Sequence, residues 1–380
     1  MKIIYVISGL TKGGGERVVV ELANKAAEKG DDVTILAAWP VNPEFLQDQI
    51  SNAVQIKFVG GGRKAAYLKI VPWIIANRKW ICSHDVLHCH LTFGALFGTC
   101  TKLLLRTILR KKTPVVVETY HAVGMPIPDF NRWVHAKMIL VKDGLVLMAK
   151  DPYWKNFVDQ HPKLENDLIP NGIAVVTPEK NEGKRQQYKK QTGVPNEAKF
   201  IVGTVSMLRP DRRPELYIPI CKKVNETFGS EACFVLGGDG IEMKNLKALV
   251  KENKLAEAFY LPGLVINAAS VIVNFDMYVS VSVGKTTGIS MIEAAMCKVP
   301  VVGIQLIEDY TATDEDWVWS HTSLDEVAKK ITHLLQNENE RQALAQKQYD
   351  YVASHFTSDA MYASYDRFYK KIISQTNTAR

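Results

Sequence analysis

Residues 276–303 have the sequence "DMYVSVSVGKTTGISMIEAAMCKVPVVG", which combines two strand-like runs with a turn and a helical run between them. The apolar residues at 276–282 and 299–304 predict buried strands. A P-loop needs a glycine five residues before its Gly-Lys pair, but Val279 stands five residues before Gly284. The stretch therefore predicts a strand–helix–strand unit of a parallel sheet and not a nucleotide-triphosphate loop.

The same alternation of strands and helices continues along most of the chain. Helical patterns such as 16–29 and 93–110 separate short apolar runs, which are typical of parallel strands covered on both faces. The predicted fold class is α/β, with two Rossmann-like, doubly wound domains that face each other across a cleft and bind ligands at the carboxyl ends of their strands. The other predicted strands lie at 2–8, 32–38, 54–60, 85–90, 114–121, 144–149, 199–206, 232–238 and 258–263.

The Pro-Asn-Gly of "LIPNGI" (168–173) marks the expected crossing between the two domains. A chain of 380 residues has room for both. We predict an N-terminal domain at 1–172 and a C-terminal domain at 173–359. The helical segment at about 360–380 is expected to pack back onto the first domain.

The composition is that of an ordinary globular protein, with 47% hydrophobic and 23% charged residues. No apolar run approaches the roughly 20 residues that span a bilayer. The opening "MKIIYVISGL" predicts a first strand rather than a signal peptide, because a glycine-rich turn and not a cleavage site follows it. The six cysteines include no Cys-x-x-Cys pair, which favours a reducing, cytoplasmic location.

Positive charge is concentrated in the N-terminal half. Residues 1–180 contain 23 Lys/Arg and 16 Asp/Glu, whereas residues 181–380 contain 24 of each. The segments 63–80 and 101–112 mix Lys and Arg with Trp, Leu and Ile, which predicts contact with an anionic membrane surface, at the inner face of the membrane. The alternative is two ordinary helices with basic outer faces. Nucleic acid is not an expected partner, because no nucleic-acid module is visible.

Glycine-rich turns follow predicted strands in both halves. They occur in "SGLTKGGGERVV" (8–19) and "VLGGDGIEMKNL" (235–246), each between a strand and a helix. Glycine lets a ligand approach the backbone, and a helix N-terminus favours negative charge. Neither turn has the Gly-x-Gly-x-x-Gly spacing of a dinucleotide site. Tight turns also need glycine for structural reasons alone, so a single such turn is weak evidence for a ligand.

An ordered series of motifs resembles the retaining glycosyltransferases of family 4, of the bacterial surface-polysaccharide type, which have the GT-B fold. The likeness extends over nearly the whole chain and includes residues 276–303. The other motifs are "GGGERVVVELA" (13–23), "DVLHCHLTFGAL" (85–96), "LIPNGI" (168–173), "VSMLRPDRRPELYI" (205–218) and "VLGGDGIEMKNLKALVKENKLAEAFYLPGLV" (235–265).

The resemblance implies that the C-terminal domain binds a nucleotide-sugar donor. Glu293 occupies the second of two family glutamate positions, where one carboxylate accepts both hydrogen bonds from a ribose diol. Gly288 and Ile289 would offer backbone N–H groups to the diphosphate at a helix N-terminus. Arg209 and Arg212 would hold the diphosphate charge without a metal ion. The predicted donor-binding set is completed by Gly14, Gly15, Gly240, Val265 and Thr287.

The chain departs from the family pattern near the reacting centre. Lys285 stands where the family has the glutamate that contacts the donor sugar, and Met207 replaces a family arginine. A lysine ammonium there would suit a donor that carries its own carboxylate, such as a hexuronic acid. His121 ends a predicted strand and matches a family histidine that faces the reacting carbon. His121 and Lys285 are therefore the candidate catalytic residues.

These features predict a retaining, metal-independent glycosyltransferase. Its donor would be a UDP-sugar, its acceptor a glycan or lipid-linked molecule bound by the N-terminal domain, and no cofactor is expected. Two alternatives remain open. One is an inactive GT-B protein that serves in binding or assembly, because Lys285 replaces a glutamate. The other is a sugar-nucleotide epimerase of the same fold.

Overall fold

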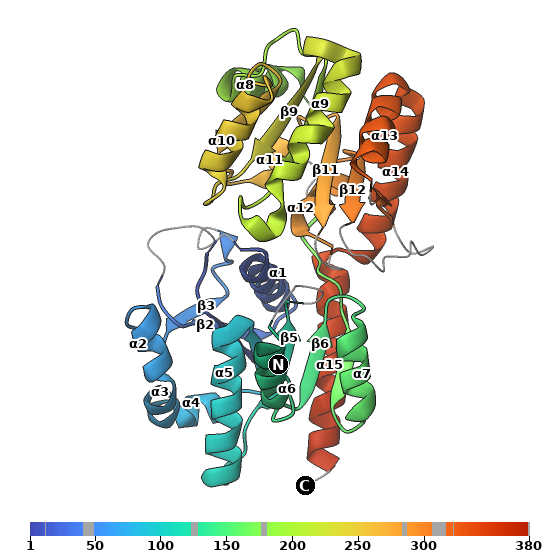
Figure 1. Cartoon of the computed structure of the whole chain (residues 1–380). Helices are drawn as coiled ribbons and strands as arrows, with labels where there is room; N and C mark the ends of the chain where they lie inside the picture. The colour runs from blue at the N-terminus through green and yellow to red at the C-terminus, as the bar shows by residue number, and fades with distance from the viewer. Residues whose placement is uncertain are drawn as a thin grey trace. The chain divides into compact units, whose positions relative to one another are not determined.

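The structure is a computed structural model that describes residues 1–11, 13–40, 49–122, 128–175, 181–282, 287–305, 317–321 and 323–378. The chain divides into two compact units. Unit 1 comprises Met1–Ala174 with Phe356–Arg380, and unit 2 comprises Val175–His355. Figure 1 shows helices on both faces of the sheet in each unit.

Unit 1 is built on a seven-stranded sheet with the order β3-β2-β1-β4-β5-β6-β7. Every pairing in it is parallel. The central strands β4 and β5 are buried along their whole length, because helices cover both faces of the sheet. The strands are β1 (Lys2–Ile7), β2 (Asp32–Ala37), β3 (Gln55–Phe58), β4 (Val86–His90), β5 (Val115–Tyr120), β6 (Gly144–Leu147) and β7 (Glu165–Leu168).

Two groups of helices cover this sheet. On one face the core joins Ile70 and Ile74 to Phe97 and Leu105, so α3 and α5 lie on the same side. Near the other face, Tyr365 and Tyr369 of the last helix pack against His88. The helices are α1 (Gly14–Glu28), α2 (Arg63–Leu68), α3 (Ile70–Ala76), α4 (Arg78–Cys82), α5 (Leu91–Thr101), the π-helix η2 (Lys102–Ile108), α6 (Asp129–Ile139), α7 (Pro152–Gln160) and α15 (Ser358–Thr378).

The C-terminal helix α15 is part of unit 1 although it follows unit 2 in the chain. Tyr362 donates a hydrogen bond to Asp31 (2.7 Å), and Lys25 of α1 forms an ion pair with Asp359 (3.0 Å). These contacts attach the end of the chain to its first βαβ segment.

Unit 2 contains a six-stranded parallel sheet with the order β10-β9-β8-β11-β12-β13. Its strands are β8 (Phe200–Val205), β9 (Ala232–Gly237), β10 (Phe259–Gly263), β11 (Met277–Ser282), β12 (Val301–Gln305) and β13 (Trp319–His321). Its α-helices are α8 (Glu182–Thr192), α9 (Tyr217–Phe228), α10 (Met243–Glu252), α11 (Ala268–Ile272), α12 (Ile289–Met296), α13 (Leu324–Gln336) and α14 (Glu338–His355).

The prediction of two doubly wound α/β units is confirmed, with two local differences. Strands β7 and β13 were not predicted, because β7 has the polar sequence "ENDL" and β13 is only three residues long. The helix predicted at 93–110 is in fact α5 followed by the π-helix η2, where Leu109 N–H donates to Leu104 C=O (2.9 Å) five residues back. None of the described helices is long and apolar enough to cross a membrane.

Candidate functional site

In each sheet the strand order reverses at one point, which is where doubly wound sheets bind ligands. The reversal lies between β1 and β4 in unit 1 and between β8 and β11 in unit 2. The segments that follow these four strands contain most of the predicted site residues.

The glycine turn of unit 1 brings the start of α1 against His121. Gly13 is the N-cap of α1. A Cβ on Gly15 would stand 3.1 Å from Leu91 Cδ2 and 3.3 Å from His121 Nδ1. A side chain at this position would fit only if Leu91 or the imidazole moved by a few tenths of an ångström. The structure therefore places Gly15 and His121 in contact, although they are far apart in the sequence.

The N-terminus of α1 already faces a carboxylate of the chain itself. Glu16 accepts a hydrogen bond from Thr11 Oγ1 (2.6 Å), and its side chain lies over Gly13. A carboxylate in the first turn stabilises the positive end of the helix dipole. An additional anion at Gly14 would be repelled by Glu16, so this turn suits a sugar hydroxyl better than a diphosphate.

His121 is held by a second histidine. It follows β5 directly, and its Nε2 lies 2.9 Å from Nδ1 of His90. Burial lowers the pKa of His121 to about 4, with the Glu118 charge acting in the opposite direction, and burial also lowers the pKa of His90. Both imidazoles are therefore neutral near pH 7, and a single N–H lies between them.

The position of that proton follows from the surroundings of His90. His90 is fully buried, and no hydrogen-bond partner of its Nε2 exists among the described residues. If His121 donated, His90 would have a buried N–H with no acceptor, which is rarer and more costly than a buried acceptor with no donor. The favoured arrangement has His90 donating from Nδ1. His121 then has its proton on Nδ1, on the side of Gly15.

His88, on the buried strand β4, has a structural role. Its Nε2 lies 2.8 Å from Thr119 Oγ1, and its Nδ1 lies 2.6 Å from the Tyr369 hydroxyl. Thr119 also contacts the Tyr365 hydroxyl (2.8 Å). These hydrogen bonds join β4, β5 and α15 beneath the His90–His121 pair.

A pocket of about 490 Å³ adjoins His121 within unit 1. Its wall includes Glu118, which accepts a hydrogen bond from His135 and forms a buried ion pair with Lys142. Burial alone would raise the pKa of Glu118, but Lys142 and His135 hold it below its usual value. The pocket is lined by Leu91, Thr92, Glu118, Thr119, Tyr120, His121, Ala122, Phe130, Asn131, Val134, His135 and Met138.

Glu118, His135 and Lys142 were not predicted as site residues. A signal for one of them was present, because Glu118 interrupts the otherwise apolar start of the strand "VVVETY". A buried carboxylate in a strand needs compensating partners. The sequence does not show which residues of α6 and the following loop supply them.

In unit 2, the turn after β8 carries the predicted arginines. Arg209 donates two hydrogen bonds to Asp211 (2.9 and 2.7 Å), and Arg212 Nε lies 3.7 Å from the same carboxylate. Burial would raise the pKa of Asp211, but the two arginines lower it. Both arginine side chains are more than a third exposed. A diphosphate would have to compete with Asp211 for their N–H groups.

The turns after β8, β9 and β10 are joined by their backbones. Leu208 N–H donates to Asp239 C=O (3.0 Å), and Gly238 N–H donates to Gly263 C=O (2.8 Å). A Cβ on Gly240 would stand 2.3 Å from the Leu208 carbonyl, so a glycine is required there for packing. Val265 is half-buried and covers Gly237. A contact of Gly240 or Val265 with the donor remains a prediction.

The start of α12 is linked to the end of β8, because the Tyr278 hydroxyl lies 2.8 Å from Ser290 Oγ and 3.1 Å from the Val205 carbonyl. Gly288 is its N-cap, and Thr287, Gly288 and Ile289 are half-buried. Glu293 lies in the second turn and is 2% exposed. Burial and then the Glu293 charge raise the pKa of Cys297 to about 12, so the carboxylate lies near that thiol. Lys285 lies outside the described residues.

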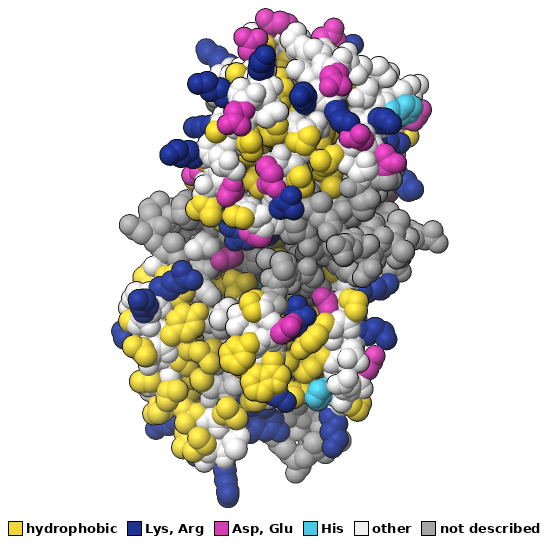
Figure 2. Space-filling view, in the orientation of Figure 1, with side chains coloured by type: hydrophobic (Ala, Val, Ile, Leu, Met, Phe, Trp, Pro, Cys, Tyr) yellow, Lys and Arg dark blue, Asp and Glu magenta, His cyan; other side chains and the backbone are white. Residues whose placement is uncertain are grey.

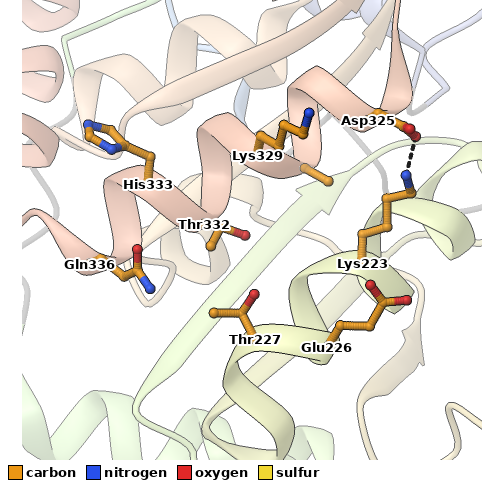
Figure 3. A pocket seen from close by; sticks show the side chains of 9 residues that line it. Lys223, Glu226, Thr227, Asp325, Lys329, Thr332, His333 and Gln336 are labelled. Atoms are coloured by element: carbon orange, nitrogen blue, oxygen red, sulfur yellow. Dashed lines mark ion pairs between the residues drawn. The ribbon is translucent and has the colours of Figure 1, made fainter.

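Two further features bear on where the chemistry occurs. Within the described part of the chain, no group of three or more His, Cys, Asp or Glu side chains could hold a metal ion. A surface groove of about 340 Å³ lies between α9 and α13, where Lys223 forms an ion pair with Asp325 (Figure 3). This groove contains none of the predicted site residues, so it does not coincide with the predicted donor or acceptor site.

Comparisons with known proteins match both units. The model "Glycosyltransferase Family 4" matches residues 12–175, and "Glycosyl transferases group 1" matches residues 184–351. An O-antigen biosynthesis glycosyltransferase, WclY, of Escherichia coli is 22% identical over 392 aligned positions, which cover 99% of each chain. Anabaena Alr3699/HepE, solved with UDP and glucose, is 14% identical, with a TM-score of 0.75 over 100% of both chains. A mutant of S. aureus TarM, solved with fondaparinux, α-GlcNAc-glycerol and UDP, is 11% identical, with a TM-score of 0.69 over 97% of this chain and 99% of that one.

Proposed function

Because the chain belongs to the group 1 glycosyltransferases with the GT-B fold, we propose that it transfers a sugar from a UDP-linked donor to a glycan or lipid-linked acceptor, with retention of configuration. One observation carries this proposal. The arginine turn after β8 and the N-terminus of α12 after β11 lie at neighbouring strand ends, where the sheet of unit 2 reverses its order.

Unit 2 binds the donor in this proposal. Arg209 and Arg212 release Asp211 and take the diphosphate in its place, and the N–H groups at the start of α12 face the same charge. Glu293 accepts hydrogen bonds from the ribose diol. Arginine side chains and backbone N–H groups stabilise the departing diphosphate, so the transfer needs no metal ion or cofactor.

Unit 1 binds the acceptor in the pocket beside His121. The apolar part of that pocket suits the flat face of a sugar, and Thr92, Asn131 and His135 supply hydrogen-bonding groups for hydroxyls. His121 presents its Nδ1–H toward Gly15, where it can donate to an oxygen of the reacting sugar.

Retention follows if the acceptor attacks from the face that the diphosphate leaves. The transition state is oxocarbenium-like, and a phosphate oxygen of the leaving group takes the proton of the acceptor hydroxyl. In this scheme His121 is a neutral hydrogen-bond donor and not a general base. That role agrees with its lowered pKa, because a neutral ring does not repel the positive charge that develops on the sugar.

In this proposal Lys285 selects the donor, because it replaces the family glutamate that contacts the donor sugar. A UDP-hexuronic acid would neutralise its ammonium through the carboxylate at C6. Competition between UDP-glucose and UDP-glucuronic acid tests this, with Lys285→Glu as the variant. Equal use of both donors, with the ratio unchanged in the variant, would show that Lys285 does not select the sugar.

The biological context is taken from the relatives. The Escherichia coli relative is described as an O-antigen biosynthesis enzyme, which supports a role in bacterial surface-polysaccharide synthesis. Donors of this type are available in the cytoplasm, and a lipid-linked acceptor would be reached at the inner face of the membrane. We therefore propose a cytoplasmic, peripheral membrane enzyme.

Binding and turnover of UDP-sugars test the proposed function. A panel of UDP-sugars is titrated into the full chain by calorimetry, and donor turnover is followed with and without EDTA. We expect a UDP-sugar to bind, the donor to be hydrolysed slowly, and the rate of turnover to be unchanged by EDTA. At a hundred times the Kd, the donor should add about 2.7 kcal/mol to the free energy of unfolding. Binding without any turnover would favour an inactive GT-B protein, and an isomerised donor without acceptor would favour an epimerase.

A further inference from the structure

Unit 1 exposes large apolar side chains on neighbouring helices over one face of its sheet. Figure 2 shows them spread across this face of the unit, with Lys and Arg around them. Contiguous exposed apolar surface usually marks an interaction site. We call six of these residues the apolar patch: Leu68 (83% exposed), Val71 (44%), Ile75 (43%), Leu103 (44%), Ile108 (69%) and Leu109 (40%).

The apolar patch is not part of the folding core. The same helices bury other residues, because Ile70 and Ile74 of α3 pack with Leu105 of η2 inside the core. Each helix therefore has a buried apolar face and a second, exposed apolar face. The exposed face lies outside the core cluster of unit 1 and is therefore available for a contact with something else.

The two segments that carry the apolar patch have charges of one sign, and the carboxylate of Asp143, which comes from another segment, is paired with Lys102 and Arg106 of η2. Residues 63–82 and 91–112 contain no Asp or Glu. We give the name basic rim to these exposed cations of the two segments: Arg63, Lys64, Lys69, Arg78, Lys79, Arg110, Lys111 and Lys112. An apolar surface bordered by cations matches the lipid–water boundary of a bilayer with negative headgroups, where the chains accept apolar groups and the phosphates attract cations.

We propose that this face of unit 1 binds an anionic lipid bilayer, with the apolar patch at the acyl boundary and the basic rim at the phosphates. Two copies of the chain would not pair through it, because each would bring its basic rim against that of the other. A dissolved polyanion would use the basic rim but would leave Leu68, Ile75 and Ile108 exposed to water.

The neighbouring helix α6 connects this face to the pocket beside His121. Phe130 (71% exposed) and Trp133 (56%) of α6 stack with ring centroids 6.2 Å apart, and Phe130 lines the pocket. Aromatic rings of this kind are favoured at the membrane interface. If the proposed transferase function holds, the headgroup of a lipid-linked acceptor reaches the pocket along α6. Bilayer binding itself does not depend on that function.

Vesicle co-sedimentation of the full chain tests the proposal. Vesicles of phosphatidylcholine, alone or mixed with phosphatidylglycerol, are compared at low and high salt. We expect binding to the anionic vesicles at low salt, and little binding to phosphatidylcholine alone. The variant Leu68→Glu/Ile75→Glu/Ile108→Glu should lose binding. Changing Lys64, Lys69 and Lys79 to Gln should weaken it about fivefold per residue, which corresponds to about 1 kcal/mol for each cation.

A matched control adds the same charge elsewhere. Leu168, Ile241 and Ile266 are 44%, 79% and 74% exposed. These values are close to those of the substituted patch residues Ile75 (43%), Ile108 (69%) and Leu68 (83%). The triple Glu variant at these three positions should bind vesicles like the wild type. Circular dichroism confirms that both triple variants fold. The proposal is wrong if the patch variant binds like the control, or if the wild type binds no anionic vesicle. It is also wrong if light scattering shows a wild-type dimer that the patch variant abolishes.

Discussion

Replacing Glu118 by glutamine should destabilise unit 1 strongly, although the two side chains have nearly the same size. Glu118 is 2% exposed and Lys142, its ion-pair partner, is 0% exposed. In Glu118→Gln the ammonium of Lys142 stays buried, and its acceptors among the described residues are neutral: the new amide oxygen, Thr99 Oγ1 (3.2 Å) and the Met138 carbonyl (3.2 Å). Removing one partner of a buried ion pair costs about 3–5 kcal/mol.

Calorimetric scans at pH 7 measure this loss. For a unit of this size, 1 kcal/mol lowers Tm by roughly 2–4 °C, so the transition of unit 1 should fall by roughly 6–20 °C. Asp159→Asn is the matched control, because the Lys155–Asp159 pair has a similar chemistry (3.2 Å) but its side chains are 79% and 61% exposed. That variant should lose less than about 1 kcal/mol.

The pH dependence has a defined sign. The pKa of Glu118 is lowered in the folded state, so its contribution is present above the unfolded pKa of about 4.3 and is lost as pH falls through the folded value. The difference in Tm between the wild type and Glu118→Gln should therefore become smaller only at acidic pH. The double variant Glu118→Leu/Lys142→Met should recover much of the loss. Equal Tm values for Glu118→Gln and Asp159→Asn would refute this account of the cluster.

Three other perturbations test the site. Glu293→Ala should weaken UDP binding by roughly 1.5–3 kcal/mol, because a ribose diol would lose its charged acceptor; unchanged affinity in calorimetry would remove Glu293 from the donor site. His121 should have its proton on Nδ1 in the ¹⁵N spectrum of histidine-labelled protein, and a protonated Nε2 would show that His121 is the donor to His90. Gly15→Ala should lower kcat by about tenfold or more with little change in UDP affinity, because the new Cβ would push on His121 Nδ1 at 3.3 Å. Gly62→Ala is the control, because a Cβ at that position meets nothing within 4 Å. Equal kcat values for the two variants would argue against the contact between Gly15 and His121.

Much of the fold could be predicted because its signals are local. The apolar runs at 2–7 and 200–205 identify buried parallel strands wherever the partner strands lie, since covered sheets need apolar residues on both faces. The glycines before α1 and after β9 likewise mark turns by their own conformational freedom. Strands β7 and β13 were not predicted, because they lie at sheet edges, where a polar or very short segment can still pair with the neighbouring strand.

The site was predicted as positions but not as contacts. The sequence by itself determined that His121 and Gly15 follow strands and that Glu118 interrupts an apolar run. Only the tertiary structure decided that His121 meets His90 and Gly15, that Glu118 is paired with Lys142 and hydrogen-bonded to His135, and that Arg209 is held by Asp211. The physical reason is that a strand pattern states which face a side chain occupies but not which neighbour lies there. Hydrogen bonds and ion pairs act over about 3 Å, and that distance is set by the pairing of strands far apart in the chain.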